Sequence, residues 1–511
     1  MLLVVAASAI AVPARREGII RTSIDGSEKV VFQHGDEHFH YLTNAEGQWL
    51  DEETLAPLTE EEANARRQAG EARRAARRIQ HQKMIGTTPN IAPRGLLIMV
   101  NFQDKSFVTP YDTIHEMLNG ENFTRSYTKD GKTITASGSA RQYFYDQSYG
   151  QYDPQFDVVG PYTVSHNYAY YGRNNDANVG EMIKEACELA DADGVDFTLY
   201  DNNEDGNVDF VYVLYAWEGE ADGGPANTVW PHNYDLSYMT YCQVDGKRVR
   251  NYACSNEIQH YAQVYDGIGT FCHEFSHVMG LPDLYETNQN LLNNHTLYDW
   301  DILDYGPYNN DGNTPPAYSA YERFFCGWIT PRVLKDPENV TLHLLNESGE
   351  ALLLCEDDTH NLVGYDPNPQ TFYLLEARTQ EGWDQYLPGK GMLITKIQYN
   401  SRKWEYNSVN NDPDNMGVDL IEARKNTTSF SKASDAFPFS TTKHWYGFEG
   451  HMVENIIRKN DGTITFIYNE GWSEGIEDVQ RDDVPCTKVL RDGKVIIIRE
   501  NKTYDILGNR L

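Results

Sequence analysis

The stretch Gly269-Thr-Phe-Cys-His273-Glu274-Phe-Ser-His277-Val-Met-Gly280-Leu-Pro-Asp283 carries the strongest structural signal in this chain. On a helix, His273 and His277 lie one turn apart on the same face, so both imidazoles can reach one zinc ion. Glu274 stands beside them, where it can hold a metal-bound water. Glycine accepts the left-handed backbone that ends a helix, so Gly280 predicts a turn that returns Asp283 as the third ligand. The zinc would keep an open fourth position, with Glu274 as the base for peptide hydrolysis.

A second interpretation of the same residues stays open. A bare H-E-x-x-H occurs by chance on amphipathic helices, but the glycine three residues on and the carboxylate three residues beyond it favour a metal site. The alternative function is a zinc- and calcium-binding surface protein or adhesin that uses a peptidase fold without catalysis. Glu274 distinguishes the two, because a structural site has no use for a base beside an open metal position.

Two runs resemble a known family. The run HEFSHVMGLPDLYE (273–286), followed by WDILDYGPYNNDG (300–312), resembles the immune inhibitor A family of secreted bacterial metallopeptidases, which belong with the metzincins. The resemblance implies a zinc endopeptidase with a twisted mixed sheet above an open cleft. Metzincins place a methionine in a turn under the zinc; Leu303 stands there and can fill a similar volume. Tyr305 matches the tyrosine with which some metzincins stabilise the oxyanion, and a packed aromatic is the alternative.

Length and charge limit the remaining possibilities. A chain of 511 residues exceeds one ordinary domain, so two or three folded units with separate cores are expected. The formal net charge of −33 argues against nucleic acid or an anionic membrane as partner, and would attract calcium. We expect protein or peptide substrates, no membrane span and a monomer. Of the seven cysteines, Cys242 and Cys254, which flank a predicted hairpin, are the one pair proposed as bridged.

The N-terminal segment has the features of an exported precursor. Residues 1–11 are apolar and end in Ala9-Ile-Ala11, as in a signal peptide. Residues 12–93 are expected to be a propeptide and a linker helix, and the run GDEHFHYLT (35–43) resembles the propeptide of the same family. Paired arginines within residues 60–83 offer a processing protease a site, so we expect a zymogen. His34, Asp36, His38 and His40 share one face of a strand, either as metal donors or, more commonly, as a polar solvent face.

The predicted catalytic domain covers residues 94–335. Apolar runs at 95–102 and 210–215 predict buried strands, and helical spacing over 180–192 predicts a helix, so the fold class is mixed α+β. Just before the second run, oxygens at alternating positions with a glycine at the sixth follow the calcium-loop pattern, and the four predicted ligands are Asp201, Asn203, Asp205 and Asp209. The glutamate expected at position twelve is replaced by Tyr212, and an Asx-rich turn is the alternative.

Two further regions follow. Short alternating strands over residues 336–470 predict a β-rich domain for substrate contact, packing or glycan adhesion. Residues 471–511 contain a strand-turn-strand unit that resembles the C-terminal sorting modules of the type IX secretion route, with an ordinary terminal hairpin as the alternative. We therefore expect a secreted or cell-surface bacterial protein.

Overall fold

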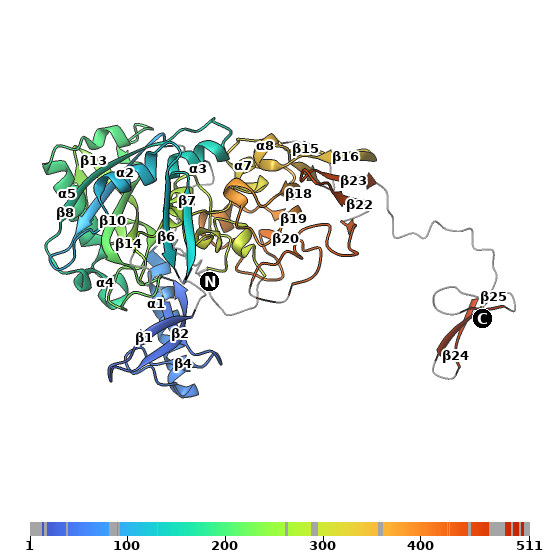
Figure 1. The fold of residues 1–511 in the computed structure, drawn as a ribbon, viewed down its shortest axis with the longest axis horizontal. Helices are drawn as coiled ribbons and strands as arrows, with labels where there is room; N and C mark the ends of the chain where they lie inside the picture. The colour runs from blue at the N-terminus through green and yellow to red at the C-terminus, as the bar shows by residue number, and fades with distance from the viewer. Residues whose placement is uncertain are drawn as a thin grey trace, which may run out of the picture.

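In a computed structural model of the chain, the described residues are 13–14, 18–36, 39–80, 89, 92–129, 131–260, 264–287, 295–355, 361–426, 428, 430–447, 451–469, 486–491, 494–499 and 502–504. Figure 1 shows a central lobe (residues 92–328) side by side with a β-rich lobe (residues 332–469). The N-terminal unit, made of the described residues between 13 and 80, lies below the central lobe. The metal-site helix predicted from the sequence lies in the central lobe.

The central lobe is built on a five-stranded sheet in the order β11-β14-β10-β5-β8. Its strands have these bounds: β5 Arg94–Asn101, β8 Gln155–Thr163, β10 Val211–Glu218, β11 His232–Asp235 and β14 Asn251–Ile258. All neighbours are parallel except β11, which pairs antiparallel with β14 at one edge. Strands covered on both faces need apolar residues at every position, which explains the unbroken Leu-Leu-Ile-Met-Val run of β5. The predicted strands at 95–102 and 210–215 are confirmed, as is a mixed α/β fold.

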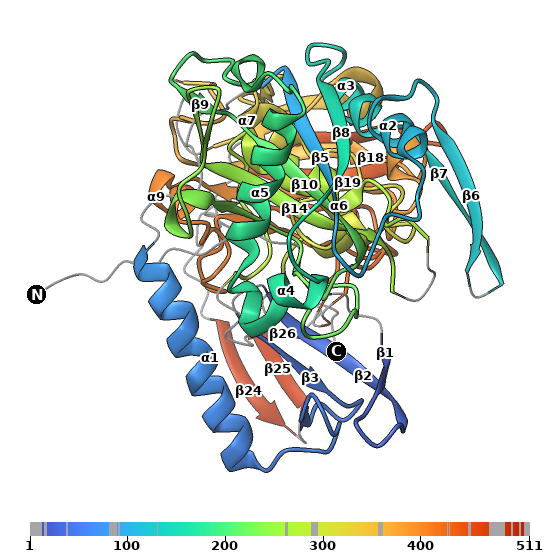
Figure 2. The same cartoon turned by 90° about the vertical axis from the view of Figure 1, so that its left-hand side faces the viewer.

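Helices cover both faces of this sheet. Alternate residues of β5 point to opposite faces. Ile98 belongs to the hydrophobic cluster of α5 (Val179–Ala192), and Met99 belongs to the cluster of α6 (Gly269–Val278). Figure 2 shows α5 and α6 on the two sides of the strands. The remaining helices and small strands of this lobe are α2 Tyr111–Asn119, α3 Ala140–Gln147, α4 Tyr168–Asp176, α7 Ala320–Phe325, β6 Thr124–Lys129, β7 Lys132–Ser137, β9 Asn207–Val208, β12 Gln243–Val244 and β13 Lys247–Val249.

Within its described residues, the β-rich lobe contains two sheets and two short α-helices. One sheet has the order β15-β17-β18-β19-β20 and the other has the order β16-β23-β22-β21. Their elements are β15 Arg332–Val333, β16 Glu338–Leu342, α8 Leu345–Ser348, β17 Leu352–Leu354, β18 Thr371–Arg378, β19 Gly391–Gln398, α9 Ser401–Glu405, β20 Val418–Leu420, β21 Trp445–Tyr446, β22 Met452–Arg458 and β23 Ile464–Asn469. The β-rich character predicted for residues 336–470 is confirmed in this part of the chain.

Each lobe has a hydrophobic cluster of its own, as expected, but the two lobes also share a third cluster, so their cores are not fully separate. Leu375 of β18 faces the second sheet of its own lobe, whereas its neighbour Leu374 belongs to the same cluster as Phe275 of α6. Phe372 of β18 meets Phe324 of α7 edge to face at 6.0 Å. Both faces of β18 are thus buried, one of them against the central lobe, and the β-rich lobe helps to support the region around α6.

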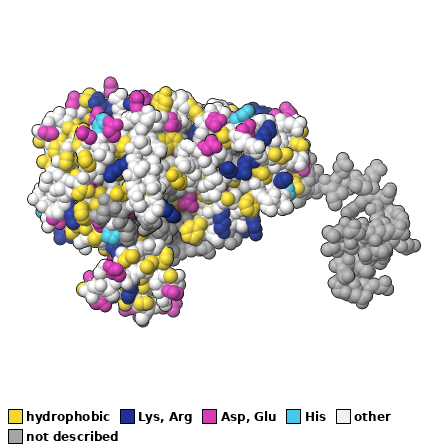
Figure 3. Space-filling model, viewed as in Figure 1, with side chains coloured by type: hydrophobic (Ala, Val, Ile, Leu, Met, Phe, Trp, Pro, Cys, Tyr) yellow, Lys and Arg dark blue, Asp and Glu magenta, His cyan; other side chains and the backbone are white. Residues whose placement is uncertain are grey.

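The N-terminal unit is a four-stranded antiparallel sheet followed by a long helix. Its elements are β1 Ile19–Thr22, β2 Glu28–Asp36, β3 Phe39–Thr43, β4 Trp49–Leu50 and α1 Glu60–Gln80. The helix predicted over residues 60–83 is confirmed to Gln80, and its first turn carries Glu60, Glu61 and Glu62, which suit the helix dipole. In Figure 3 this unit forms a small knob beneath the central lobe, with charged side chains of both signs spread over the visible face.

The last described segments form a separate three-stranded antiparallel sheet. Its strands are β24 Cys486–Arg491, β25 Lys494–Arg499 and β26 Lys502–Tyr504. The strand-turn-strand pattern of the C-terminal tail is therefore confirmed as secondary structure. No helix among the described residues is both long enough and apolar enough to cross a bilayer.

Candidate metal centre

Helix α6 begins and ends where its glycines require. A Cβ on Gly269 would lie only 2.0 Å from the carbonyl oxygen of Pro307, so only glycine lets the helix start this close to the loop that packs on it. At the other end, Gly280 has the left-handed φ of +84° and its N–H donates to the His277 carbonyl. The chain therefore turns back at Gly280, as the sequence predicts, and carries Asp283 toward the helix.

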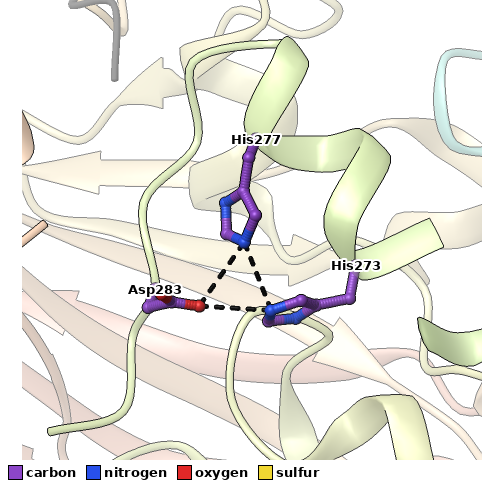
Figure 4. Close-up of side chains that lie close together, drawn as sticks. All are labelled: His273, His277 and Asp283. Carbon is purple, nitrogen blue, oxygen red and sulfur yellow. Dashed lines mark hydrogen bonds and ion pairs between the residues drawn. The ribbon is translucent and has the colours of Figure 1, made fainter. Parts of the chain in front are cut away.

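Three side chains meet at one point, as Figure 4 shows. The Nε2 atoms of His273 and His277 are 3.2 Å apart, and Oδ1 of Asp283 lies 3.2 Å from the first and 3.5 Å from the second. His273 and Asp283 are fully buried, and His277 nearly so. Among the described residues, these three form the single group of side chains placed to hold a metal ion.

The donor atoms fit a zinc ion. Tetrahedral bonds of about 2.0–2.1 Å place neighbouring donors about 3.3 Å apart, which matches the three separations. Oδ1 of Asp283 is buried and accepts no hydrogen bond from the described residues. A buried carboxylate oxygen without a donor is costly, and a cation between the three donors would remove that cost.

Backbone carbonyls fix the two imidazoles in the orientation that a metal requires. The Nδ1–H of His273 donates to the Ile302 carbonyl at 2.7 Å, and the Nδ1–H of His277 donates to the Leu281 carbonyl at 2.7 Å. Each ring then presents the lone pair of Nε2 toward the shared point. Burial lowers the pKa of His277 to about 4, which keeps this imidazole neutral, the form that binds metal.

The loop after α6 packs beneath the three ligands. Leu303 is fully buried, and its carbonyl accepts the N–H of Leu284, next to the third ligand. Its neighbour Ile302 supplies the carbonyl that holds His273. Leu303 thus lies in a turn that is hydrogen-bonded to the residue after the third ligand, and its equivalence to the methionine of metzincins stays a prediction. Tyr305 is half-buried with its ring tilted against Tyr298 at a centroid distance of 6.1 Å, and its role in the oxyanion site stays a prediction.

Glu274 is fully buried on α6, next to His273. Its position between the two ligands in sequence is as predicted.

An asparagine from the β-rich lobe also reaches the centre, and no sequence pattern predicted it. The amide of Asn407 donates to Oδ2 of Asp283 at 2.6 Å, and its Oδ1 accepts the N–H of Asp283 at 2.8 Å. The two residues are 124 positions apart, and no motif surrounds Asn407. Only the packing of the two lobes brings them together.

The predicted calcium loop has the expected bend, and a lysine side chain is hydrogen-bonded to one of its carboxylates. Gly206 adopts the left-handed φ of +87° that the sharp turn needs. Asp201 accepts the backbone N–H groups of Asp205 and Gly206, and it also accepts the ammonium of Lys247 at 2.6 Å. Asp209 accepts two N–H groups of Asn202. These contacts are those of an Asx-rich turn neutralised by lysine, and calcium binding by Asp201, Asn203, Asp205 and Asp209 stays a prediction.

The predicted disulfide is wrong. Cys242 and Cys254 are both free thiols. Cys242 hydrogen-bonds to Cys187 of α5, whereas Cys254 lies in the centre of the sheet with its sulfur 3.6 Å from Nδ1 of His232. The hairpin between the two cysteines, β12–β13, is confirmed, but it does not bring its flanks together.

The histidines of the N-terminal unit take roles other than metal binding in the described part of the chain. Nε2 of His40 lies 2.9 Å from Oε1 of Glu220 in the central lobe, and its ring stacks on Trp230 at 5.3 Å. His34 hydrogen-bonds to Thr43 within its own sheet. The side chain of Asp36 and all of His38 lie outside the described residues. Glu220, like Asn407, makes a contact that no sequence pattern predicted.

An H-E-x-x-H helix whose two histidines meet a carboxylate in a mixed α/β lobe is an arrangement typical of metallopeptidases. Residues 96–328 match the family model described as immune inhibitor A peptidase M6, catalytic domain, which confirms the resemblance inferred from the sequence.

Two named relatives are similar over the same part of the chain. The pre-pro-metalloprotease PrtV of Vibrio cholerae serotype O1 is 29% identical over 254 residues, which are 44% of this chain and 25% of that protein. Immune inhibitor A of Bacillus thuringiensis subsp. alesti is 24% identical over 246 residues, which are 41% of this chain and 35% of that protein. The matched region therefore spans about a quarter to a third of the length of these relatives.

Proposed function

We propose that this chain is a secreted bacterial zinc endopeptidase that is made as a zymogen. The observation that carries the proposal is the buried group of His273, His277 and Asp283, with donor separations that suit zinc and with Glu274 next to the first ligand. The match to the peptidase family supports the reaction class. The substrates would be proteins or peptides, and we expect the active form to be a monomer.

Each residue has a defined task in this proposal. His273, His277 and Asp283 hold the zinc, which when bound polarises the scissile carbonyl and lowers the pKa of a bound water. Glu274 takes the proton of the attacking water and passes it to the leaving amine. The carbonyls of Ile302 and Leu281 accept the Nδ1–H groups and so keep both Nε2 atoms aimed inward. Tyr305 would donate a hydrogen bond to the oxyanion.

Latency would come from the docked N-terminal unit. The side chain of Gln33 donates to the Glu220 carbonyl at 2.9 Å beside the His40–Glu220 pair. Further along, the Tyr308 hydroxyl donates to the Pro13 carbonyl at 2.6 Å, and Tyr308 lies in the loop that packs on α6. The N-terminal unit is thus hydrogen-bonded to the central lobe near the metal centre. Cleavage between residues 60 and 95 would sever it from β5.

The experiment is cleavage of a peptide library by the processed protein, with and without a zinc chelator. Cleavage that stops with chelator and returns with added zinc is expected. A protein that binds zinc but cleaves nothing would favour the alternative of a surface protein or adhesin on a peptidase fold. Binding of such a protein to a glycan array would then be the next measurement.

A further inference from the structure

We infer that Asn407 is a positioning residue for the third metal ligand, so that the β-rich lobe completes the metal centre. The inference rests on the proposal that Asp283 binds metal. Asn407 makes two hydrogen bonds to Asp283, one to its carboxylate and one from its backbone N–H. Both residues are fully buried, so water does not compete for these bonds.

The two bonds select which oxygen faces the histidines. Oδ2 of Asp283 is held by the Asn407 amide, while Oδ1 points at the two Nε2 atoms, 3.2 and 3.5 Å away. Rotation of the carboxylate about its Cβ–Cγ bond would break the first contact. The hydrogen bond from the backbone N–H of Asp283 to Oδ1 of Asn407 fixes the backbone of Asp283. Asn407 therefore restrains both ends of the ligand side chain.

Asn407 is itself held by the contact between the lobes. It follows α9, whose Trp404 is fully buried and donates its indole N–H to the hydroxyl of Tyr321 on α7. The Asn407 backbone has the left-handed φ of +47°, which asparagine tolerates better than most residues. Its carbonyl accepts the hydroxyl of Thr287, four residues beyond the ligand. The segment that contains Asn407 thus hydrogen-bonds to the loop that carries Asp283 at more than one residue.

The segment lies outside the part of the chain that matches the peptidase family model, which ends at residue 328. A lobe that only bound substrate would have no reason to place a fully buried amide on a metal ligand. Partners of this kind typically change metal affinity or activity about 10- to 100-fold when they are removed.

The test uses the full chain in a Glu274→Gln background, which prevents self-cleavage. Asn407→Gly removes both bonds and keeps the left-handed backbone, and Asn407→Asp keeps the acceptor while it replaces the amide donor. Asn411→Ala is the matched control. Asn411 lies in the same segment as Asn407, and its side chain hydrogen-bonds to Thr287. Zinc affinity is measured by competition with a chromogenic chelator, and the cobalt(II)-loaded forms are compared by visible absorption.

Both Asn407 variants are expected to bind zinc about 10- to 100-fold more weakly and to shift the cobalt spectrum, while Asn411→Ala matches the parent. Melting temperatures of the metal-free proteins identify any variant that fails to fold. If one Asn407 variant does not fold, the zinc affinity and cobalt spectrum of the other one test the inference. Parental zinc affinity and a parental cobalt spectrum in a folded Asn407 variant would overturn the inference. If zinc binding depends on Asn407 in this way but the trimmed chain with Glu274 intact cleaves no peptide, the proposed function is contradicted and the inference stands.

Discussion

Replacing His40 with glutamine should loosen the N-terminal unit from the central lobe. His40 and Glu220 lie 2.9 Å apart, with 11% and 3% of their side chains exposed. Burial by itself would lower the pKa of His40, but Glu220, with smaller contributions from Glu52 and Asp176, raises it from 6.5 to about 9. This difference corresponds to about 3 kcal/mol, or roughly a few hundredfold in the docking equilibrium.

The pH dependence has a definite sign. Because the pKa of His40 is raised in the docked state, the contribution is fully present below about pH 6.5 and is lost as the pH rises through about 9. The assay is hydrogen exchange of residues 28–43 in Glu274→Gln protein from about pH 6 to about pH 10, corrected for intrinsic exchange rates. Exchange should rise with pH in the parent and should already be high at low pH in His40→Gln.

His34 provides the matched control. It lies in the same sheet, hydrogen-bonds to Thr43 of that sheet, and has a pKa that burial lowers to about 4. His34→Gln should therefore keep the pH dependence of the parent. Equal exchange in parent and His40→Gln across the whole range would refute the proposed role of the His40–Glu220 pair.

Three further outcomes are expected. Asp283→Ala should lower the zinc content of the purified protein, measured by elemental analysis, because it removes one of three protein ligands; full occupancy would mean that another residue supplies the third ligand. Leu303→Met should leave the rate of peptide cleavage nearly unchanged, since the two side chains fill similar volumes; a large gain in rate would show that leucine impairs the site. Limited trypsin treatment should raise the initial rate on a casein-like substrate and create a new N-terminus between residues 60 and 95. Equal rates before and after treatment would contradict latency.

Local patterns predicted the parts of the site that lie close together in sequence. The four-residue spacing of His273 and His277 and the left-handed glycine at 280 depend on backbone geometry alone, so the helix, its end and the return of Asp283 could be foreseen. The strand β5 could be foreseen because a strand buried on both faces must be apolar at every position.

The contacts that could not be predicted all join segments that are distant in sequence. Asn407 reaches Asp283 across 124 residues, and His40 reaches Glu220 from a separate sheet. No spacing or composition marks Asn407, and the alternating pattern that includes His40 does not indicate Glu220 as its partner. The proposed disulfide failed for the related reason that a hairpin fixes local backbone pairing but not where its flanking residues point.

The most direct test of the account is the Glu274→Gln variant of the trimmed protein. Zinc content and the initial rate on a peptide substrate are measured on the same preparation. The amide is close in shape to the carboxylate but cannot accept a proton from water, so zinc should stay bound while the rate falls by about a hundredfold to ten-thousandfold. A variant that keeps both its zinc and the wild-type rate would contradict the assignment of Glu274 as the base and, with it, the proposed catalytic centre.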